Sequence, residues 1–258
     1  MTKHRSRRRS SGPSGDLVVE HLYKRFGGIE ASHDVTFALA QGSVLGVIGP
    51  NGSGKTTVVN LLTGAYRPDR GSIRVGGVET AGWAAHKIAA LGVARTFQNP
   101  HVFRTLTIRQ NLLVSVQHRG ATETTRRVQE ETEEWLSKLG LSDHADRVAH
   151  ELSGGQQKLV EFARAMVLRP RVVLMDEPFA GIHAEVKKIL RARIAEIARA
   201  GETSFLIVSH EIPDLVSLSD SLLCMANGRV LLTGSPAAVC RAPEVIEAYL
   251  GVTLDGAA

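Results

Sequence analysis

The sequence predicts an α/β fold with a parallel-sheet core, a small antiparallel β subdomain and an inserted α-helical subdomain. Its first sign is the apolar run Val44–Ile48, which leads into a glycine-rich loop at 49–57 and then into the apolar stretch Val58–Leu62. Two further apolar runs, 171–175 and 203–208, have the uniform hydrophobicity of parallel strands that are covered on both faces.

The loop at 49–57 satisfies the phosphate-loop pattern G-x-x-x-x-G-K-[ST]. Between a strand and a helix, such a loop turns its backbone N–H groups and the helix N-terminus toward phosphate oxygens. Lys55 is placed to bind the β- and γ-phosphates, and the Thr56 hydroxyl is a ligand for Mg²⁺. The candidate nucleotide-binding residues of the loop are Gly49, Pro50, Asn51, Gly52, Ser53, Gly54, Lys55, Thr56 and Thr57.

The net charge of +5 comes from a basic tail rather than from a basic face. Residues 1–15 contain five basic residues and no acid, and the rest of the chain is neutral. We expect this tail to be disordered and solvated, although contact with anionic lipid or nucleic acid stays open, and we expect no nucleic-acid partner for the folded domain. No apolar stretch follows the basic N-terminus, and no apolar run approaches the roughly 18 residues of a membrane helix. We therefore expect no signal peptide, and a cytoplasmic protein with reduced thiols at Cys224 and Cys240.

Ahead of the phosphate loop, two β-like segments, 17–26 and 31–39, predict a small antiparallel sheet joined at Gly27-Gly28. Phe26 is a candidate for stacking on an adenine ring, but a core aromatic residue would give the same pattern. Beyond the loop, the sequence predicts a strand, a helix and a second strand at 72–76, 83–91 and 92–97. The last of these ends at Gln98, a residue that carries no signal by itself.

Residues 107–168 are largely helical in pattern and predict a helical subdomain at about 99–165. Its helices are expected at 108–116, 125–139 and 158–168. The last follows Leu152-Ser153-Gly154-Gly155-Gln156, where Ser153 suits an N-cap and the glycines expose N–H groups. This segment is either a second anion site or an ordinary helix cap.

Polar side chains follow two of the predicted core strands, at the edge where α/β sheets place their chemistry. The strand at 171–178 ends in Asp176 and Glu177, which can hold Mg²⁺ and polarise a water molecule, and His210 follows the strand at 203–208. Taken alone, solvated acids or a structural histidine would explain these residues. The remaining elements are expected as helices at 186–197 and 211–217, strands at 221–226 and 229–233 joined by an Asn227-Gly228 turn, and a short helix opened by Pro243.

Together these motifs resemble the ATP-binding-cassette (ABC) ATPases, a group with a P-loop NTPase (RecA-like) core. The likeness runs from about Leu17 to Gly251 and implies one ABC ATPase domain at 16–251, with a flexible C-terminal tail at 252–258. In this family Gln98 corresponds to the Q-loop glutamine, 152–156 to the signature, Asp176-Glu177 to the Walker B pair and His210 to the switch histidine.

The resemblance also implies a mechanism that uses ATP and Mg²⁺. Two cassettes pair head to tail, so that Ser153, Gly154, Gly155 and Gln156 of one bind the γ-phosphate held by Lys55 of the other. Glu177 is the implied general base, His210 positions the attacking water, and Gln98 senses water and metal. The implied metal ligands are Thr56, Gln98 and Asp176.

A finer resemblance is to the ATPases of branched-chain amino acid importers, the Liv type. It rests on 25–28, 94–98, 155–158 and the ending Ala242–Gly251. It implies uptake of branched-chain or related amino acids, powered from the cytoplasmic face of the cell membrane. The implied partners are a second ABC ATPase subunit, giving a heterodimer, transmembrane permeases and, indirectly, an extracytoplasmic substrate-binding protein.

Two features depart from the family pattern, and two other functions stay open. His183 lies in the D-loop, Ala180–Ala184, where Asp or Asn followed by Pro is common, and the stretch 117–132 is short. The alternatives are a cassette for urea, amides or lipopolysaccharide, and a soluble ABC ATPase such as one for iron–sulfur cluster assembly. A DNA-structural cassette is excluded because only 98 positions separate Lys55 from Ser153, with no long heptad run.

Overall fold

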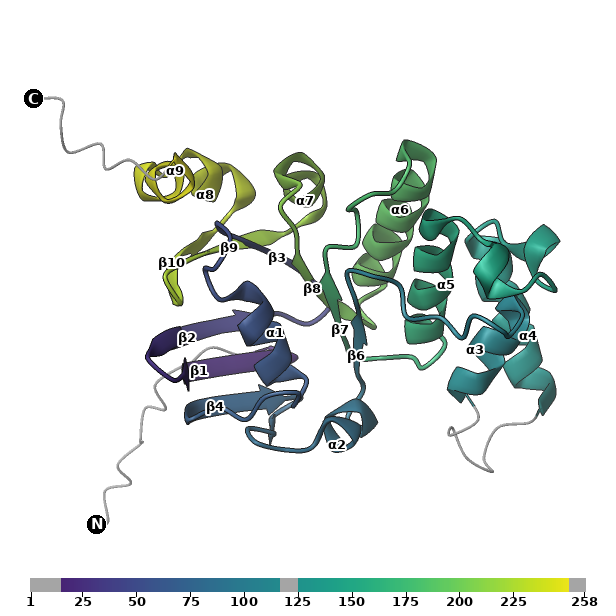
Figure 1. Cartoon of the computed structure of the whole chain (residues 1–258), viewed down its shortest axis with the longest axis horizontal. Coiled ribbons are helices and arrows are strands. Elements are labelled where there is room, and N and C mark those ends of the chain that lie inside the picture. The colour runs from purple at the N-terminus through teal and green to yellow at the C-terminus, as the bar shows by residue number, and fades with distance from the viewer. Residues whose placement is uncertain (1–14, 117–124, 251–258) are drawn as a thin grey trace, which may run out of the picture.

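The computed structural model describes residues 15–116 and 125–250. Nearly all of the basic tail, the C-terminal tail and much of the stretch 117–132 therefore lie outside the described residues. Figure 1 shows a central sheet with an antiparallel sheet beside it and helices at the other end. Within the described ranges, no helix is both long and apolar enough to cross a membrane.

The central sheet has six strands in the order β10-β9-β3-β8-β7-β6. Five of them run parallel and the edge strand β10 is antiparallel, which confirms the parallel-sheet core. The strands are β3 (Val44–Ile48), β6 (Val93–Thr96), β7 (Val172–Asp176), β8 (Ser204–Val208), β9 (Ser221–Ala226) and β10 (Arg229–Gly234).

A second, antiparallel sheet has four strands in the order β2-β1-β4-β5. Its strands are β1 (Leu17–Phe26), β2 (Ile29–Leu39), β4 (Arg70–Val75) and β5 (Val78–Glu79). The antiparallel subdomain is thus present. However, two of its strands come from beyond the phosphate loop, and β5 was not predicted at all.

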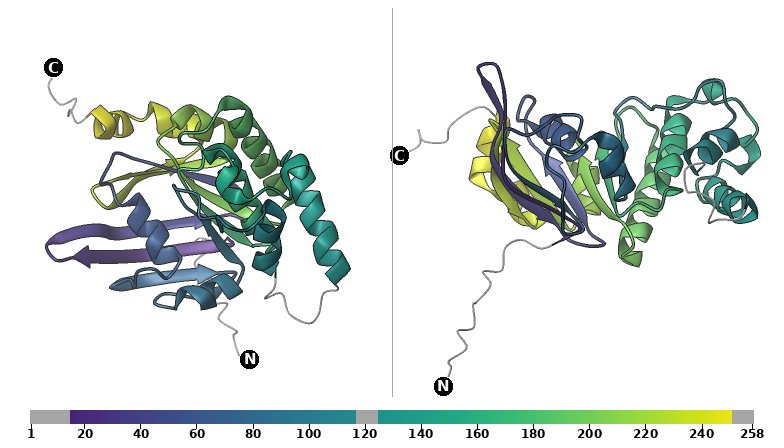
Figure 2. Two further views of the ribbon diagram at one scale, coloured as in Figure 1. Left: turned by 45° about the vertical axis from the view of Figure 1, so that its right-hand side comes forward. Right: turned by 90° about the horizontal axis from the view of Figure 1, so that it is seen from below.

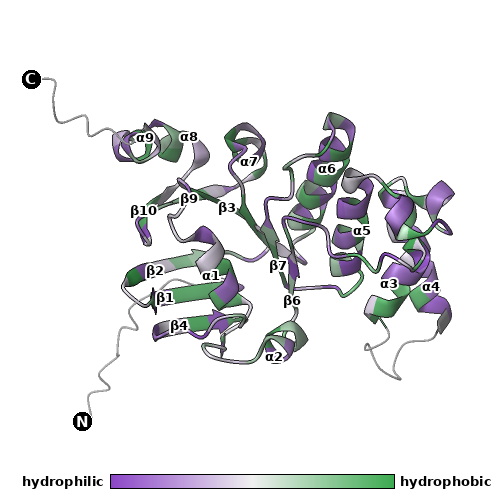
Figure 3. Ribbon diagram, in the orientation of Figure 1, coloured by the Kyte–Doolittle hydropathy of each residue, from purple (hydrophilic) through white to green (hydrophobic). Residues whose placement is uncertain are grey.

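Strands β3, β7 and β8 are buried along their whole length, as their uniform hydrophobicity predicts. Figure 3 colours the middle of this sheet as hydrophobic. In β7, Val172 and Leu174 join the core toward the antiparallel sheet, whereas Val173 and Met175 join the core toward the helices. Much of α4 (Thr125–Lys138), by contrast, is hydrophilic in Figure 3. It anchors in the core through Trp135, whose ring meets Phe162 edge-on at 6.1 Å between centroids.

The helices that flank the central sheet largely match the predicted ones. Helices α3 and α4 lie at the far end of the molecule from β1, β2 and β4 (Figures 1 and 2). One short helix, α8, was missed: the Ser235 side chain caps it and Pro236 occupies its first position. The other bounds are α1 (Lys55–Leu62), α2 (Ala85–Ala90), α3 (Ile108–Val116), α5 (Gly154–Met166), α6 (Ala184–Ala200), α7 (Ile212–Leu218), α8 (Pro236–Arg241) and α9 (Pro243–Leu250), with 3₁₀ turns at Ser142–His144 and Ala149–Glu151.

Candidate functional site

The carboxyl ends of the parallel strands and the phosphate loop enclose a cavity of about 620 Å³. It brings together the loop, Gln98, the Asp176-Glu177 pair and His210, although these come from distant parts of the chain. The sequence-predicted residues among its lining are Asn51, Gly52, Ser53, Gly54, Lys55, Thr56, Thr57, Gln98, Asp176, Glu177 and His210.

The phosphate loop can follow its path only with glycine at two positions. Gly54 has φ +100°, and a Cβ there would lie 2.4 Å from the carbonyl oxygen of Ala31. Gly49 has φ +148°, and its Cβ would lie 2.1 Å from the carbonyl oxygen of Met225. Helix α1 begins at Lys55, directly after Gly54. The free N–H groups of its first turn therefore face the loop. The geometry therefore forms an anion cradle.

Lys55 is the cation of this cradle. Its Nζ donates hydrogen bonds to the carbonyl oxygens of Gly49 and Pro50, at 2.7 and 2.9 Å. Burial lowers the pKa of Lys55, and the nearby carboxylates of Glu177 and Asp176 act in the opposite direction. Lys55 therefore lies between the backbone of the loop and the acids at the strand ends.

Asp176 ends β7 and lines the same cavity as the exposed Thr56. Burial raises the pKa of the Asp176 carboxyl, and Arg95, whose Nη2 lies 3.6 Å from Asp176 Oδ2, opposes that rise. Carboxylate, hydroxyl and amide oxygens from Asp176, Thr56 and Gln98 suit Mg²⁺, which is commonly held by one or two carboxylates together with substrate phosphates. The donor set thus fits the expected metal.

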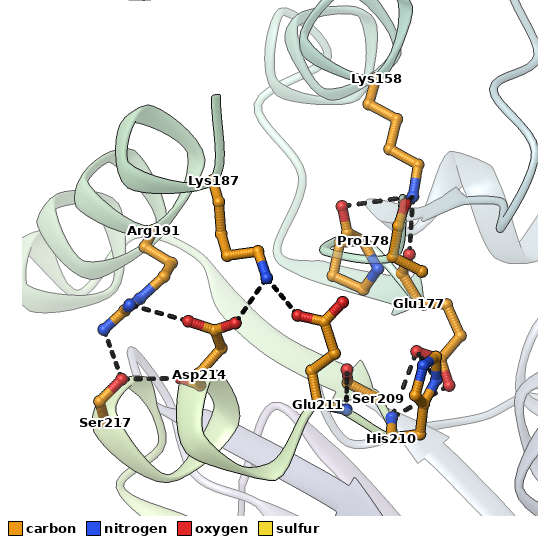
Figure 4. Close-up of polar contacts among 11 residues, drawn as sticks. Lys158, Glu177, Pro178, Lys187, Arg191, Ser209, His210, Glu211, Asp214 and Ser217 are labelled. Carbon is orange, nitrogen blue, oxygen red and sulfur yellow. Dashed lines mark hydrogen bonds and ion pairs between the residues drawn. The ribbon is translucent and has the colours of Figure 1, made fainter. Parts of the chain in front are cut away.

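Glu177 and His210 contact one another at the cavity wall (Figure 4). The backbone N–H of His210 donates to both carboxylate oxygens, at 3.1 and 3.2 Å, and its ring Nδ1 lies 2.9 Å from Glu177 Oε2. Glu177 has φ +51°, a left-handed conformation that is uncommon for a residue with a side chain. The left-handed backbone of Glu177 and its contacts with His210 therefore both orient this carboxylate.

Lys158, on helix α5, holds the turn that follows β7, from Glu177 to Ala180 (Figure 4). It is buried, and its Nζ donates to the carbonyl oxygens of Glu177 and Ala180 at 2.9 and 2.8 Å. Apart from its place two residues after Gln156, nothing in the sequence pattern singles out this lysine. A charged residue on the apolar side of a helix is the signal that could have identified it.

The remaining candidate residues do not line the cavity. Phe26 lies at the end of β1, where its ring meets Tyr66 edge-on at 5.2 Å, and Gly49 and Pro50 begin the phosphate loop without lining the cavity. The signature lies at the head of α5 and forms a capping box: Ser153 Oγ accepts from Gln156 N–H, and Gln156 Oε1 accepts from Ser153 N–H. Ser153 and Gly154 are exposed there, and Gly155 packs on Val186.

Tyr249 contacts the phosphate loop from the C-terminal helix α9, a link that the sequence did not reveal. Its hydroxyl oxygen accepts a hydrogen bond from the N–H of buried Gly49 at 2.7 Å. Burial raises the pKa of Tyr249 to about 12. Tyr249 belongs to the segment Ala242–Gly251, one of the segments that resemble the Liv type. Through this tyrosine, that segment supports the phosphate loop.

Replacing Tyr249 by Phe leaves the Gly49 N–H without its partner. An unpaired buried donor costs about 1–3 kcal/mol, so we expect a loss of that size in the free energy of unfolding and a weaker affinity for ATP. Urea unfolding and equilibrium ATP binding measure the two effects. Tyr66→Phe, at a tyrosine of similar exposure (40% against 38% for Tyr249), is the control; equal stability and affinity in Y249F and Y66F would contradict the role of the hydroxyl.

Glu161, on α5, makes stability depend on pH. Burial raises its pKa from 4.5 to about 7, against the pull of backbone N–H donors from His101 and Phe97. The folded chain thus keeps a proton that the unfolded chain has lost, and this stabilising contribution disappears as the pH rises through that interval. Between pH 5 and pH 8 we expect wild type to lose about 2–3 kcal/mol relative to Glu161→Gln. Urea unfolding of both proteins at the two pH values tests this, and parallel pH profiles would refute it.

Comparison with known proteins gives consistent matches across the chain. Residues 32–180 match the family described as ABC transporter. The chain is 40% identical over 249 residues to the high-affinity branched-chain amino acid transport ATP-binding protein BraF of Pseudomonas aeruginosa, covering 91% of this chain and 97% of BraF. It is 38% identical, with the same coverage, to LivG of Escherichia coli, and 34% identical to the lipopolysaccharide export system ATP-binding protein LptB of Acidithiobacillus ferridurans, with 91% and 96% covered.

Two solved structures extend this likeness to the fold. A nucleotide-free ATP-binding cassette from an ABC transporter superposes with a TM-score of 0.82 at 30% identity, covering 93% of this chain and all of the other. The ADP conformation of the cassette MJ1267 gives a TM-score of 0.81 at 31% identity, with the same coverage. The predicted combination of a parallel core, an antiparallel subdomain and helices is that of these cassettes.

Proposed function

Because the chain belongs to the ABC transporter family, we propose that it is the ATP-hydrolysing subunit of an importer for branched-chain or related amino acids. The single observation that carries this proposal is the 38–40% identity to LivG and BraF over nearly the full length of each. The relative named for lipopolysaccharide export is less similar, at 34%.

The cavity supports a division of labour for ATP hydrolysis. The phosphate loop and Lys55 bind the phosphates through backbone N–H groups and one cation. Thr56, Gln98 and Asp176 would hold Mg²⁺, which would supply positive charge against the charge that develops on the phosphates. Glu177 takes the proton of the attacking water, and His210, which contacts the Glu177 carboxylate, positions that water. Such catalysis depends mainly on positioning and electrostatics, which a rigid loop between strand and helix supplies.

A second cassette is part of the proposal because the signature lies outside this chain's own cavity. Ser153 and Gly154 are exposed at the head of α5, where N–H groups and the helix dipole favour a phosphate. A head-to-tail pair would bring Ser153, Gly154, Gly155 and Gln156 of one cassette to the nucleotide of the other. We propose that the second cassette is a different chain, as in Liv-type systems.

The proposed assembly lies at the cytoplasmic face of the cell membrane. Permease subunits bind the two cassettes, and an extracytoplasmic binding protein delivers the solute to the permeases. Closure and opening of the ATPase pair, driven by ATP binding and hydrolysis, then switch the permeases between two states.

Purification of the tagged chain from gently solubilised membranes of its host tests the proposal. We expect membrane-spanning permeases and a second cassette to copurify, and ATPase activity of the reconstituted assembly to rise when a binding protein loaded with leucine, isoleucine or valine is added. If a binding protein loaded with another solute stimulated the ATPase activity instead, the proposed substrate class would be wrong. Recovery of lipopolysaccharide-export components or of soluble partners alone would overturn the importer.

A further inference from the structure

One lysine of helix α6 holds two acids that lie at the beginning of helix α7. Lys187 Nζ contacts a carboxylate oxygen of Glu211 and lies 2.9 Å from Asp214 Oδ2 (Figure 4). Glu211 is the residue after His210 and the N-cap of α7, and Asp214 belongs to the first turn of that helix. Lys187 therefore joins α6 to the segment that begins with His210.

Arg191, one helical turn further along α6, supports one of these acids but not the other. Its Nη1 lies 2.9 Å from Asp214 Oδ1, and its Nη2 donates a hydrogen bond to Ser217 Oγ. Asp214 thus has two cations, one at each carboxylate oxygen. Among the residues that the structure describes, Lys187 is the only cation bonded to Glu211. Loss of Lys187 would therefore leave Glu211 without a bonded counter-charge, whereas loss of Arg191 would not.

The turn before α7 carries His210 and is anchored on both sides of this histidine. On the side of the central sheet, Ser209 is fully buried, and its Oγ accepts a hydrogen bond from the N–H of Glu211 at 3.1 Å. On the side of α6, the Glu211 carboxylate is bonded to Lys187. His210 lies between these two anchored residues and contacts the Glu177 carboxylate. The position of the histidine therefore depends on where Lys187 holds Glu211.

Charge repulsion would move this turn if the shared cation were absent. Two carboxylates that are bonded to one ammonium group lie close together, so Glu211 and Asp214 would repel each other without Lys187. Glu177 adds a third negative charge on the other side of His210. The three side chains that meet at the lysine are partly exposed, and such ion pairs add little to overall stability. We therefore expect removal of Lys187 to disturb the turn locally rather than to unfold the chain.

We propose that Lys187 is a positioning residue for His210. Its bonds to Glu211 and Asp214 hold the turn 209–211 against α6, and this keeps His210 in contact with the Glu177 carboxylate and within reach of the attacking water. Lys187 does not line the nucleotide cavity, so it acts through the turn and not on the nucleotide. The inference rests on the proposed ATPase function and deepens it, because it gives a residue of α6 control over the position of the histidine.

Four variants of the full-length chain test this proposal. Lys187→Met removes the cation, and Lys187→Arg retains a cation that can bond both acids. Arg191→Met removes the neighbouring cation but leaves the contact between Lys187 and Glu211. Lys188→Met is the matched control, because this exposed lysine is adjacent on the same helix and carries the same charge. Amide hydrogen exchange, resolved by residue, reports the order of the turn, and steady-state ATP hydrolysis reports its consequence.

In K187M we expect the amides of His210 and Glu211 to exchange about fivefold faster or more, because the turn loses its attachment to α6. We expect kcat to fall by about tenfold while KM for ATP stays within about twofold, because misplacement of His210 affects the chemical step and leaves the phosphate loop intact. K187R should recover most of both losses. R191M and K188M should stay within about twofold of wild type in both measurements, since Glu211 keeps its cation in each.

A double-mutant cycle tests whether Lys187 acts through Glu211. Glu211→Gln removes the charge that Lys187 compensates and still offers an oxygen atom to the lysine. Because the repulsion from Asp214 is then lost, K187M should lower kcat by about threefold or less in the E211Q background. An undiminished loss in that background would overturn the role of Glu211.

Wild-type exchange of His210 and Glu211 in K187M would overturn the attachment of the turn, and so would equal acceleration in K188M or R191M. Faster exchange with wild-type kcat would overturn the positioning of His210. Exchange is measured without hydrolysis, so an inactive wild-type chain would refute the proposed function while leaving the attachment to be decided by exchange alone.

Discussion

Glu177→Gln is expected to lower kcat for ATP hydrolysis by about 10²–10⁴-fold, the usual contribution of a general base, while ATP affinity is retained. Glutamine has the same length and still accepts the hydrogen bond that the His210 N–H donates to Glu177. It cannot take a proton from water. The substitution therefore removes the proposed chemistry and leaves the geometry of the cavity in place.

Single-turnover hydrolysis and equilibrium binding of ATP measure these two quantities separately. Glu185→Gln, at an exposed glutamate in the first turn of α6, is the control and should behave as wild type. Hydrolysis by E177Q at the wild-type rate would remove Glu177 from the role of base. Loss of ATP binding would instead assign it a structural role.

Lys55→Ala is expected to weaken ATP binding by about 10- to 100-fold, because a hydrogen bond from a cation to a phosphate contributes about 1.5–3 kcal/mol. The two loop carbonyls that Lys55 now bonds, those of Gly49 and Pro50, belong to the nucleotide cradle, so both the charge and the local order of the loop are affected. Turnover should fall with binding, since the β/γ-phosphate contact is lost.

Titration with ATP and with AMP tests where Lys55 acts. We expect the loss in K55A to be large for ATP and small for AMP, which has no β- or γ-phosphate. Lys188→Ala, at an exposed lysine of α6, controls for the change in net charge. Equal losses for both nucleotides would indicate collapse of the loop rather than loss of a phosphate contact.

The elements with strong local signals could be predicted well from the sequence. Strand β9 has the predicted bounds, and α3 begins and ends where its pattern indicates. Helix α5 begins at Gly154, directly after the predicted N-cap Ser153, although the apolar pattern indicates a helix only from Lys158. The capping box of Ser153 and Gln156 compensates for the low helix propensity of Gly154 and Gly155.

Contacts between distant segments could not be predicted in the same way. The motif residues were found because each has a known chemistry, and the cavity brings most of them together. Glu161, Lys158 and Tyr249 act through backbone groups far along the chain, and a backbone partner has no sequence signature. The antiparallel sheet shows the same limit, since the pairing of β1 with β4 joins segments on either side of the phosphate loop.

Strand β3, which leads into the phosphate loop, lies between β8 and β9, and both of these come from beyond residue 203. The antiparallel sheet draws all of its strands from residues 17–79 and can close early in synthesis. A ribosome must translate most of the chain before β3 gains either neighbour. A nascent chain that stops short of β8 would therefore contain the whole loop sequence and still be unable to capture ATP, so the nucleotide cannot guide the first steps of folding.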